Sequence, residues 1–266
     1  MSNYPRVIPI LLLKEDGLYK THKYKNPIYI GDPINTIKIF NDKECDELII
    51  IDIQASKSKK PPNFKLLEDL SSECFMPITY GGGIKSLNDI KSIFKLGIEK
   101  IALNSVLLEN SSIISEAKDI FGSQSIIGVI DINKTLLGNH CLYDYQLGKN
   151  IKKNIIDYAK NLEDKGVGEL LINFVYLENS RKGYDIEFLR NFLPHFQIPI
   201  IANGGIASLN DIKEGLDIGI NAAAAGSFFI FKKNNNGILI SYPSYEMIKE
   251  QILNIKTNNE YNISTM

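Results

Sequence analysis

The chain has 266 residues, of which 44% are hydrophobic and 23% charged, so it can bury a full core and is not a disordered protein. Its 30 basic and 31 acidic side chains give a formal net charge of −1, which removes the general electrostatic case for nucleic-acid or membrane-surface binding. We find no apolar run of membrane-spanning length, no secretory signal pattern, and only three scattered cysteines. These features predict a soluble, cytoplasmic α/β protein without metal or other cofactor.

Short apolar segments rich in β-branched residues recur along the chain, separated by amphipathic segments of helix length. Continuous apolar runs are expected where both faces of a parallel strand are buried. We expect eight strands, at Val7–Leu13, Glu47–Ile53, Pro77–Tyr80, Lys100–Leu103, Ser125–Ile132, Glu169–Phe174, Pro199–Ala202 and Ala222–Ala225. Eight strand–helix units in a chain of this length predict a single (β/α)₈ TIM barrel over residues 1–255, followed by a polar tail at 256–266.

An internal repeat supports this architecture. The hexapeptide Ser86–Lys91 returns unchanged as Ser208–Lys213, 122 residues later. In each copy the serine precedes an aspartate by three residues, which predicts a capping box at a helix start. Two shorter matches have the same offset, Glu47-Leu48 with Glu169-Leu170 and Gly82-Gly83-Ile84 with Gly204-Gly205-Ile206. The sequence therefore predicts two half-barrels of four units each. Asp32 and Ser244 are further expected helix caps.

Two glycine-rich turns follow the expected third and seventh strands, at the barrel end where active sites lie. Each turn is followed about 20 residues later by a small polar pair, Asn104-Ser105 in one half and Gly226-Ser227 in the other. Glycines allow backbone N–H groups to approach an anion closely, so the two turns predict a ligand with a phosphate at each end. The alternative is that these glycines only turn the chain tightly. The candidate ligand-binding residues are Lys20, Asp52, Gly82, Gly83, Asn104, Ser105, Glu178, Gly204, Gly205, Gly226 and Ser227.

Carboxylates close two of the expected strands, Asp52 the second and Asp131 the fifth, and Glu178 lies beyond the sixth. Burying a carboxylate beside an apolar strand costs stability and raises its pKa, so Asp131 is a candidate general acid or base. The alternative for each aspartate is a structural carboxylate that caps a helix or pairs with Lys20.

The chain resembles the cyclase subunit of imidazole glycerol phosphate synthase along nearly its whole length. The segments that carry the resemblance are Val7-Ile8-Pro9, Gly31-Asp32-Pro33, Asp46-Glu47-Leu48, Tyr80 to Ile84, Phe121 to Gln124, Ile130-Asp131, Lys182 to Asp185 and Ala202 to Gly205. The resemblance implies a half-barrel-duplicated (β/α)₈ fold and a glutamine amidotransferase partner, whose ammonia travels along the barrel axis. In that family the ammonia splits and cyclises a bisphosphate intermediate with the help of two aspartates. Asp131 matches the aspartate of the fifth strand.

Two departures put the usual reaction in doubt. Leu12 occupies the position of the other catalytic aspartate, and leucine cannot transfer a proton. In the sixth-strand loop, Asn173-Phe174 replaces a Thr-Ser pair, and we expect the bulky Phe174 to point toward the pocket.

Four charged residues match the salt-bridged ring through which ammonia enters the barrel in that family: Arg6, Glu47, Lys100 and Glu169. The alternative is four unrelated solvated charges at strand starts. Retained ammonia entry combined with a lost catalytic acid indicates that ammonia serves different chemistry.

Further segments resemble a divergent branch of the family found among surface-glycan genes, including Leu11 to Lys14, Tyr24 to Asn35, Ser72 to Pro77 and Gly226 to Phe231. This resemblance implies conversion of a sugar acetamido group to an acetamidino group, on a phosphorylated or nucleotide-sugar ligand. A glutaminase and a third, synthetase-like protein are the implied partners. One alternative is the cyclase of histidine biosynthesis, and a second is a non-catalytic activator of the glutaminase.

Overall fold

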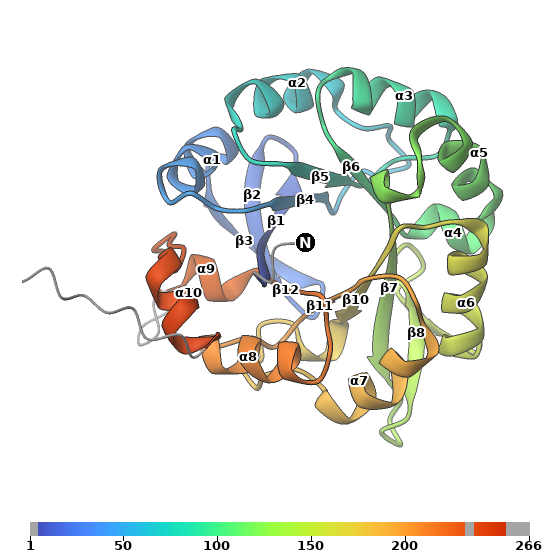
Figure 1. The fold of residues 1–266 in the computed structure, drawn as a ribbon. Coiled ribbons are helices and arrows are strands. Elements are labelled where there is room, and N and C mark those ends of the chain that lie inside the picture. The colour runs from blue at the N-terminus through green and yellow to red at the C-terminus, as the bar shows by residue number, and fades with distance from the viewer. Residues whose placement is uncertain (1–4, 232–236, 254–266) are drawn as a thin grey trace, which may run out of the picture.

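The computed structural model describes residues 5–231 and 237–253, and shows the predicted (β/α)₈ barrel (Figure 1). The expected tail at 256–266 and the expected domain end at residue 255 lie outside the described residues. Eight parallel strands pair in a closed ring, because β12 pairs with β1. In ring order they are β1 (Arg6–Lys14), β4 (Leu48–Asp52), β5 (Ile78–Gly81), β6 (Lys100–Leu103), β7 (Ile126–Lys134), β10 (Glu169–Phe174), β11 (Ile200–Asn203) and β12 (Ala222–Ala225).

Helices surround the barrel and cover the outer faces of its strands. They are α1 (Pro33–Asp42), α2 (Phe64–Glu73), α3 (Leu87–Lys95), α4 (Ser105–Glu109), α5 (Ser112–Phe121), α6 (Ile155–Lys165), α7 (Ile186–Phe192), α8 (Leu209–Asp217), α9 (Ser227–Ile230) and α10 (Tyr245–Gln251). The described residues also form the short 3₁₀ turns η1 (Ser123–Ser125), η2 (Val175–Leu177) and η3 (Leu193–His195).

The predicted helix starts are confirmed. Ser86 before α3 and Ser208 before α8 both form complete capping boxes, in which serine and aspartate satisfy each other's backbone N–H groups. Asp32 caps α1 and Ser244 caps α10.

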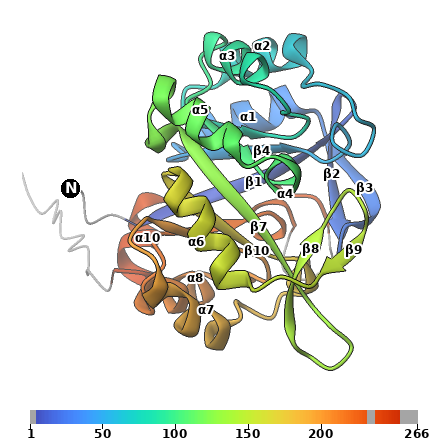
Figure 2. The same ribbon diagram turned by 90° about the vertical axis from the view of Figure 1, so that its right-hand side faces the viewer.

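Two antiparallel hairpins were missing from the predicted strands. One contains β2 (Gly17–His22) and β3 (Lys25–Gly31) and follows β1; the other contains β8 (His140–Asp144) and β9 (Lys149–Ile151) and follows β7. Figure 2 places both at the end of the barrel opposite the start of β1. Both hairpins lie outside the ring, and their outer strands β3 and β9 are largely exposed. They therefore lack the continuous apolar run that predicted the barrel strands.

Alternating side chains of each strand pack on two sides of the sheet. On β1, Val7, Leu11 and Leu13 pack outward under the helices, whereas Ile8, Ile10 and Leu12 pack inward. The inner cluster fills the barrel interior with aliphatic groups and alanines, so the barrel is a packed core. Among the helices of the described residues, none combines the length and apolar character that crossing a bilayer requires.

Candidate active site

One pocket at the carboxyl ends of the barrel strands brings together the predicted catalytic residue and every predicted ligand-binding residue. Its lining includes Lys20, Asp52, Gly82, Gly83, Asn104, Ser105, Asp131, Glu178, Gly204, Gly205, Gly226 and Ser227. Positions far apart in the chain meet here because every parallel strand ends at the same rim.

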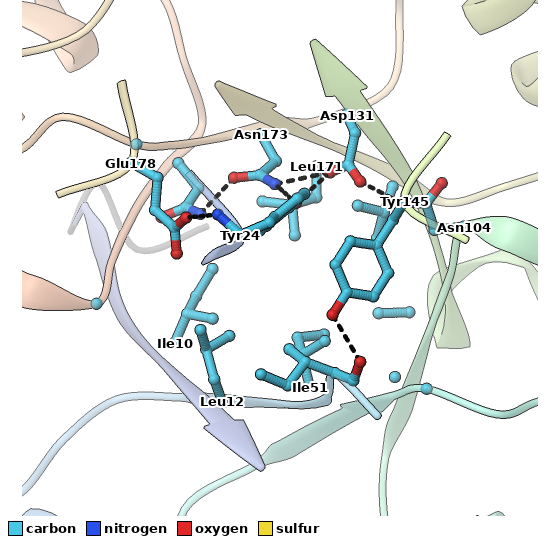
Figure 3. Close-up of a pocket in the computed structure, with 18 of the residues that line it drawn as sticks. Ile10, Leu12, Tyr24, Ile51, Asn104, Asp131, Tyr145, Leu171, Asn173 and Glu178 are labelled. Atoms are coloured by element: carbon cyan, nitrogen blue, oxygen red, sulfur yellow. Dashed lines mark hydrogen bonds between the residues drawn. The ribbon is translucent and has the colours of Figure 1, made fainter. Parts of the chain in front are cut away.

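Asp131 is the buried carboxylate of this pocket, with 4% of its surface exposed. Its Oδ1 accepts hydrogen bonds from the Tyr24 hydroxyl at 2.8 Å and from Asn173 Nδ2 at 2.7 Å. Its Oδ2 accepts one from Asn104 Nδ2 at 2.9 Å (Figure 3). Burial raises the pKa of Asp131 to about 6, against the opposing effect of these three donors. A carboxyl group that titrates near neutrality is suited to accepting and returning a proton.

Tyr24 is a pocket residue that the sequence analysis did not single out. It comes from the turn between β2 and β3, and its ring meets the Tyr145 ring edge-on at 4.8 Å. Burial, followed by the nearby charges of Asp131 and Glu178, raises the pKa of Tyr24 well above its usual value. Tyr24 is therefore a hydrogen-bond donor here and not a base. A lone tyrosine between lysines gives no sequence signal for such a position.

Asn173 joins the site, and the expectation about Phe174 was wrong. Phe174 is fully buried outside the barrel ring, where its ring packs against Tyr176 and Phe188. Asn173 lies on the pocket side, bonded to Asp131 and accepting a hydrogen bond from Asn203 Nδ2 at 2.8 Å. The strand alternation carries the signal for this, because Leu171 packs inward and the next inward residue is Asn173.

Opposite this polar group lies an apolar wall. Ile10, Leu12 and Ile51 line the pocket on the β1–β4 side, facing Asp131 and Asn173 across it (Figure 3). Leu12 is 8% exposed. The pocket therefore has one hydrogen-bonding wall and one hydrocarbon wall.

The glycine turns have the backbone that glycine permits. Gly82 and Gly83 have φ of 118° and 71°, and Gly204 and Gly205 have φ of 112° and 94°. Asp52, beside the first turn, uses Oδ1 to accept hydrogen bonds from the backbone N–H groups of Gln54 and Ala55, both at 2.9 Å. Burial raises its pKa against these two bonds. Asp52 does not bond to Lys20, so it shapes a turn at the pocket edge.

At the end of β12, the strand that follows the second glycine turn, Lys20 lies against Gly226: a Cβ built on Gly226 would be 2.8 Å from Lys20 Nζ. Lys20 Nζ is also 3.6 Å from Glu178 Oε1, with both side chains over 90% buried. The Ser227 hydroxyl is buried in the same region and has no hydrogen-bond partner among the described residues. Lys20 and Ser227 both line the pocket, and an ammonium and a hydroxyl can both donate hydrogen bonds to an anion.

The other end of the barrel holds four charged side chains in mutual contact, here called the ion-pair ring: Arg6, Glu47, Lys100 and Glu169. Arg6 is 2.7 Å from Glu169 and 3.3 Å from Glu47, and Lys100 is 2.6 Å from Glu169 and 3.4 Å from Glu47. Although burial acts in the opposite direction, Arg6 and Lys100 lower the pKa of Glu169. The alternative of four independent solvated charges does not hold.

Between the ring and the pocket, the barrel interior is apolar. Its lining includes Ile8, Ile49, Ile127, Ile201 and Ala222. A charged group would pay a large desolvation cost in such an interior, whereas a small neutral molecule would not.

The comparisons with known proteins agree with this architecture. Residues 6–235 match the family described as histidine biosynthesis protein. A Pseudomonas aeruginosa protein provisionally named imidazole glycerol phosphate synthase subunit hisF2 is 44% identical over 239 residues, covering 90% of this chain and 95% of that protein. A Campylobacter jejuni protein with the same provisional name is 44% identical, covering 86% and 90%. The imidazole glycerol phosphate synthase subunit HisF of Exiguobacterium sibiricum is 32% identical, covering 84% and 90%.

Proposed function

This chain belongs to the histidine biosynthesis protein family, as a HisF-like cyclase subunit, and on that basis we propose that it is an ammonia-using synthase subunit. Its partner in this proposal is a glutamine amidotransferase that docks at the end of the barrel bearing the ion-pair ring. Ammonia released by the partner passes the ring, crosses the apolar interior as the neutral molecule, and reaches Asp131.

The reaction we propose is amidination of a sugar, acetamido to acetamidino. The two-walled pocket supports this most directly. An acetamido carbon carries a methyl group on one side and polar atoms on the other, which matches Leu12 and Ile51 facing Asp131 and Asn173. The nitrogen of ammonia forms the new C–N bond, the oxygen leaves with its electron pair, and Asp131 accepts a proton from the attacking nitrogen.

Because an amide oxygen is a poor leaving group, it must be activated before ammonia attacks. We assign that step to a third, synthetase-like protein. The two glycine turns then hold phosphate groups of a sugar or nucleotide-sugar ligand, and the Lys20 ammonium with the Ser227 hydroxyl serves the second of them.

Two other functions remain alternatives. The name of the Exiguobacterium sibiricum relative favours the histidine-pathway cyclase, which makes imidazole glycerol phosphate from ammonia and the bisphosphate intermediate. Leu12 weighs against it, because no carboxylate faces Asp131 from β1 and general acid–base assistance contributes about 10²–10⁴-fold. A non-catalytic activator of the glutaminase would need neither Asp131 nor the glycine turns.

The first experiment supplies the purified protein with ammonium and the bisphosphate intermediate and follows imidazole glycerol phosphate. We expect no turnover from the wild type, and measurable turnover from Leu12→Asp, which restores the second carboxylate. Leu12→Asn is the matched control, because asparagine is similar to aspartate in size and polarity but cannot act as a general base. Wild-type turnover would refute the sugar proposal in favour of the cyclase.

The second experiment combines the chain with the glutaminase, an activated acetamido sugar and glutamine. Mass spectrometry detects the acetamidino product about one mass unit below the unactivated acetamido sugar, since NH replaces O and the activating group leaves with the oxygen. Product from the wild type but not from Asp131→Asn supports the proposal. If the wild type and Asp131→Asn stimulated the glutaminase equally and neither gave product, the result would favour the non-catalytic activator.

A further inference from the structure

The turn of the β2–β3 hairpin is built to hold Tyr24 in the pocket. His22 pairs with Lys25, and the two residues between them, Lys23 and Tyr24, have left-handed φ values of 48° and 62°. Two-residue turns of this kind normally contain glycine or asparagine. Other residues persist in this conformation only where surrounding contacts hold them.

Those contacts converge on Glu178, which lies in the loop after β10 and is 7% exposed. Its carboxylate accepts a hydrogen bond from the Tyr24 backbone N–H at 2.6 Å and one from the Thr21 hydroxyl, and it faces Lys20 Nζ at 3.6 Å. Three residues of the hairpin, Lys20, Thr21 and Tyr24, thus contact one buried side chain. Burying a carboxylate is costly unless it has partners, and these residues of the described chain supply partners for Glu178.

The held tyrosine completes the surroundings of Asp131. An ionised carboxylate offers about four acceptor positions. Tyr24 and Asn173 occupy Oδ1, and Asn104 occupies one position on Oδ2. Among the described residues no other donor reaches Asp131, so its remaining acceptor position is on Oδ2.

Asn104 and Asn173 come from barrel strand ends, whereas Tyr24 arrives on an added hairpin. We propose that Tyr24 is a positioning residue for the reaction at Asp131: held by Glu178, its hydroxyl saturates Oδ1 and leaves Oδ2 to meet the incoming nitrogen. This inference rests on the proposed function for the identity of Asp131 as the reacting carboxylate. It also gives Glu178, which lines the pocket, the structural task of holding the hairpin.

The test measures the carboxyl group directly, without any substrate. Protein labelled with ¹³C at the aspartate carboxyl carbons is titrated by NMR, and the Asp131 signal is assigned by its loss in Asp131→Asn. Removing a hydrogen bond that stabilises the charged form raises a pKa. We therefore expect the Asp131 midpoint to rise by about one pH unit in Tyr24→Phe.

Tyr29→Phe is the matched control, because Tyr29 lies on the same hairpin but is 56% exposed and contacts Tyr19 through its ring. We expect the Asp131 titration midpoint in Tyr29→Phe to equal that in the wild type. The inference would be overturned if the Asp131 titration midpoint in Tyr24→Phe equalled that of the wild type. It would also be overturned if the midpoint rose by the same amount in Tyr29→Phe. Because the titration needs no turnover, it gives an answer even if the amidination assay fails.

Discussion

Leu12 and Asp131 occupy equivalent positions in the two halves of the barrel. Leu12 pairs with Ile51 on β4, and Asp131 pairs with Asn173 on β10. Ile51 and Asn173 are 122 residues apart, the offset of the internal repeat. The two positions of one half are therefore aliphatic and the same two of the other half are polar. The pocket's unlike walls are the same structural positions with different side chains.

The buried Asp131 makes the stability of the protein depend on pH. Its pKa is raised from an ordinary 3.8 to about 6, so the folded state holds a proton that the unfolded state has lost between these values. The stabilisation is complete below about pH 4 and is lost as the pH rises through about 6, a loss of about 3 kcal/mol. We expect the free energy of unfolding of the wild type, relative to Asp131→Asn, to fall by this amount between pH 4 and 7. Urea titrations at each pH measure it, and a constant difference would contradict the assignment.

The ion-pair ring predicts a loss of stability when one anion is neutralised. Glu169→Gln leaves two partly buried cations sharing Glu47, and we expect a loss of about 1–3 kcal/mol. Glu73→Gln is the control. The side chains of Glu73 and its partner Lys38 are 41% and 54% exposed, so this ion pair should contribute less than about 1 kcal/mol to stability. Urea unfolding measures the free energy of unfolding of both variants and of the wild type. Equal losses would mean that the ring acts as ordinary surface charge.

The same variant tests the ring as an ammonia entrance. If ammonia passes here, Glu169→Gln should lower the product formed per glutamine hydrolysed at least twofold. Activity with added ammonium salt should change less, because ammonium can supply ammonia from the open pocket end. A loss of equal size with both nitrogen sources would argue against passage through the ring.

The first glycine turn predicts a steric cost as well as a conformational one. A Cβ on Gly82 would be 2.4 Å from the Asp52 carbonyl oxygen, so Gly82→Ala must move backbone, and we expect a loss of about 3 kcal/mol. Gly97 also has a positive φ, 87°, but its Cβ would meet nothing within 4 Å. Gly97→Ala should therefore cost only the conformational part, about 1 kcal/mol. Thermal or urea unfolding separates the two, and equal losses would contradict the steric argument.

The barrel could be predicted from the sequence because its strands are buried on both faces and its repeat is long. The all-alanine strand β12 and the apolar β10 were predicted at their observed bounds. The bounds of β6 also match the prediction, and the edges of the other strands differ by one or two residues, as at β7, which continues to Lys134 into the hairpin. The residues lining the pocket followed from the same logic, because strand ends converge on one rim.

The hairpins and Tyr24 could not be predicted in this way. Their residues are held by contacts to groups far away in the chain, such as Tyr24 to the Asp131 side chain and Tyr145 to the Ile53 carbonyl oxygen at 2.7 Å. No local pattern encodes partners more than 90 residues away. Phe174 was misplaced for a different reason: its size suggested the pocket, whereas the two-residue period of β10 assigns it to the outer face.

The two hairpins follow β1 and β7, the equivalent strands that carry Leu12 and Asp131, and they meet where Tyr24 contacts Tyr145. They differ in length and in what they contribute. The β2–β3 hairpin supplies the Tyr24 hydroxyl to Asp131, and the β8–β9 hairpin supplies the Tyr145 ring, which packs against Tyr24. A symmetrical ligand would therefore encounter unequal surroundings at its two ends. We therefore expect a ligand with two similar anionic ends to bind the two proposed glycine-turn sites in one preferred orientation.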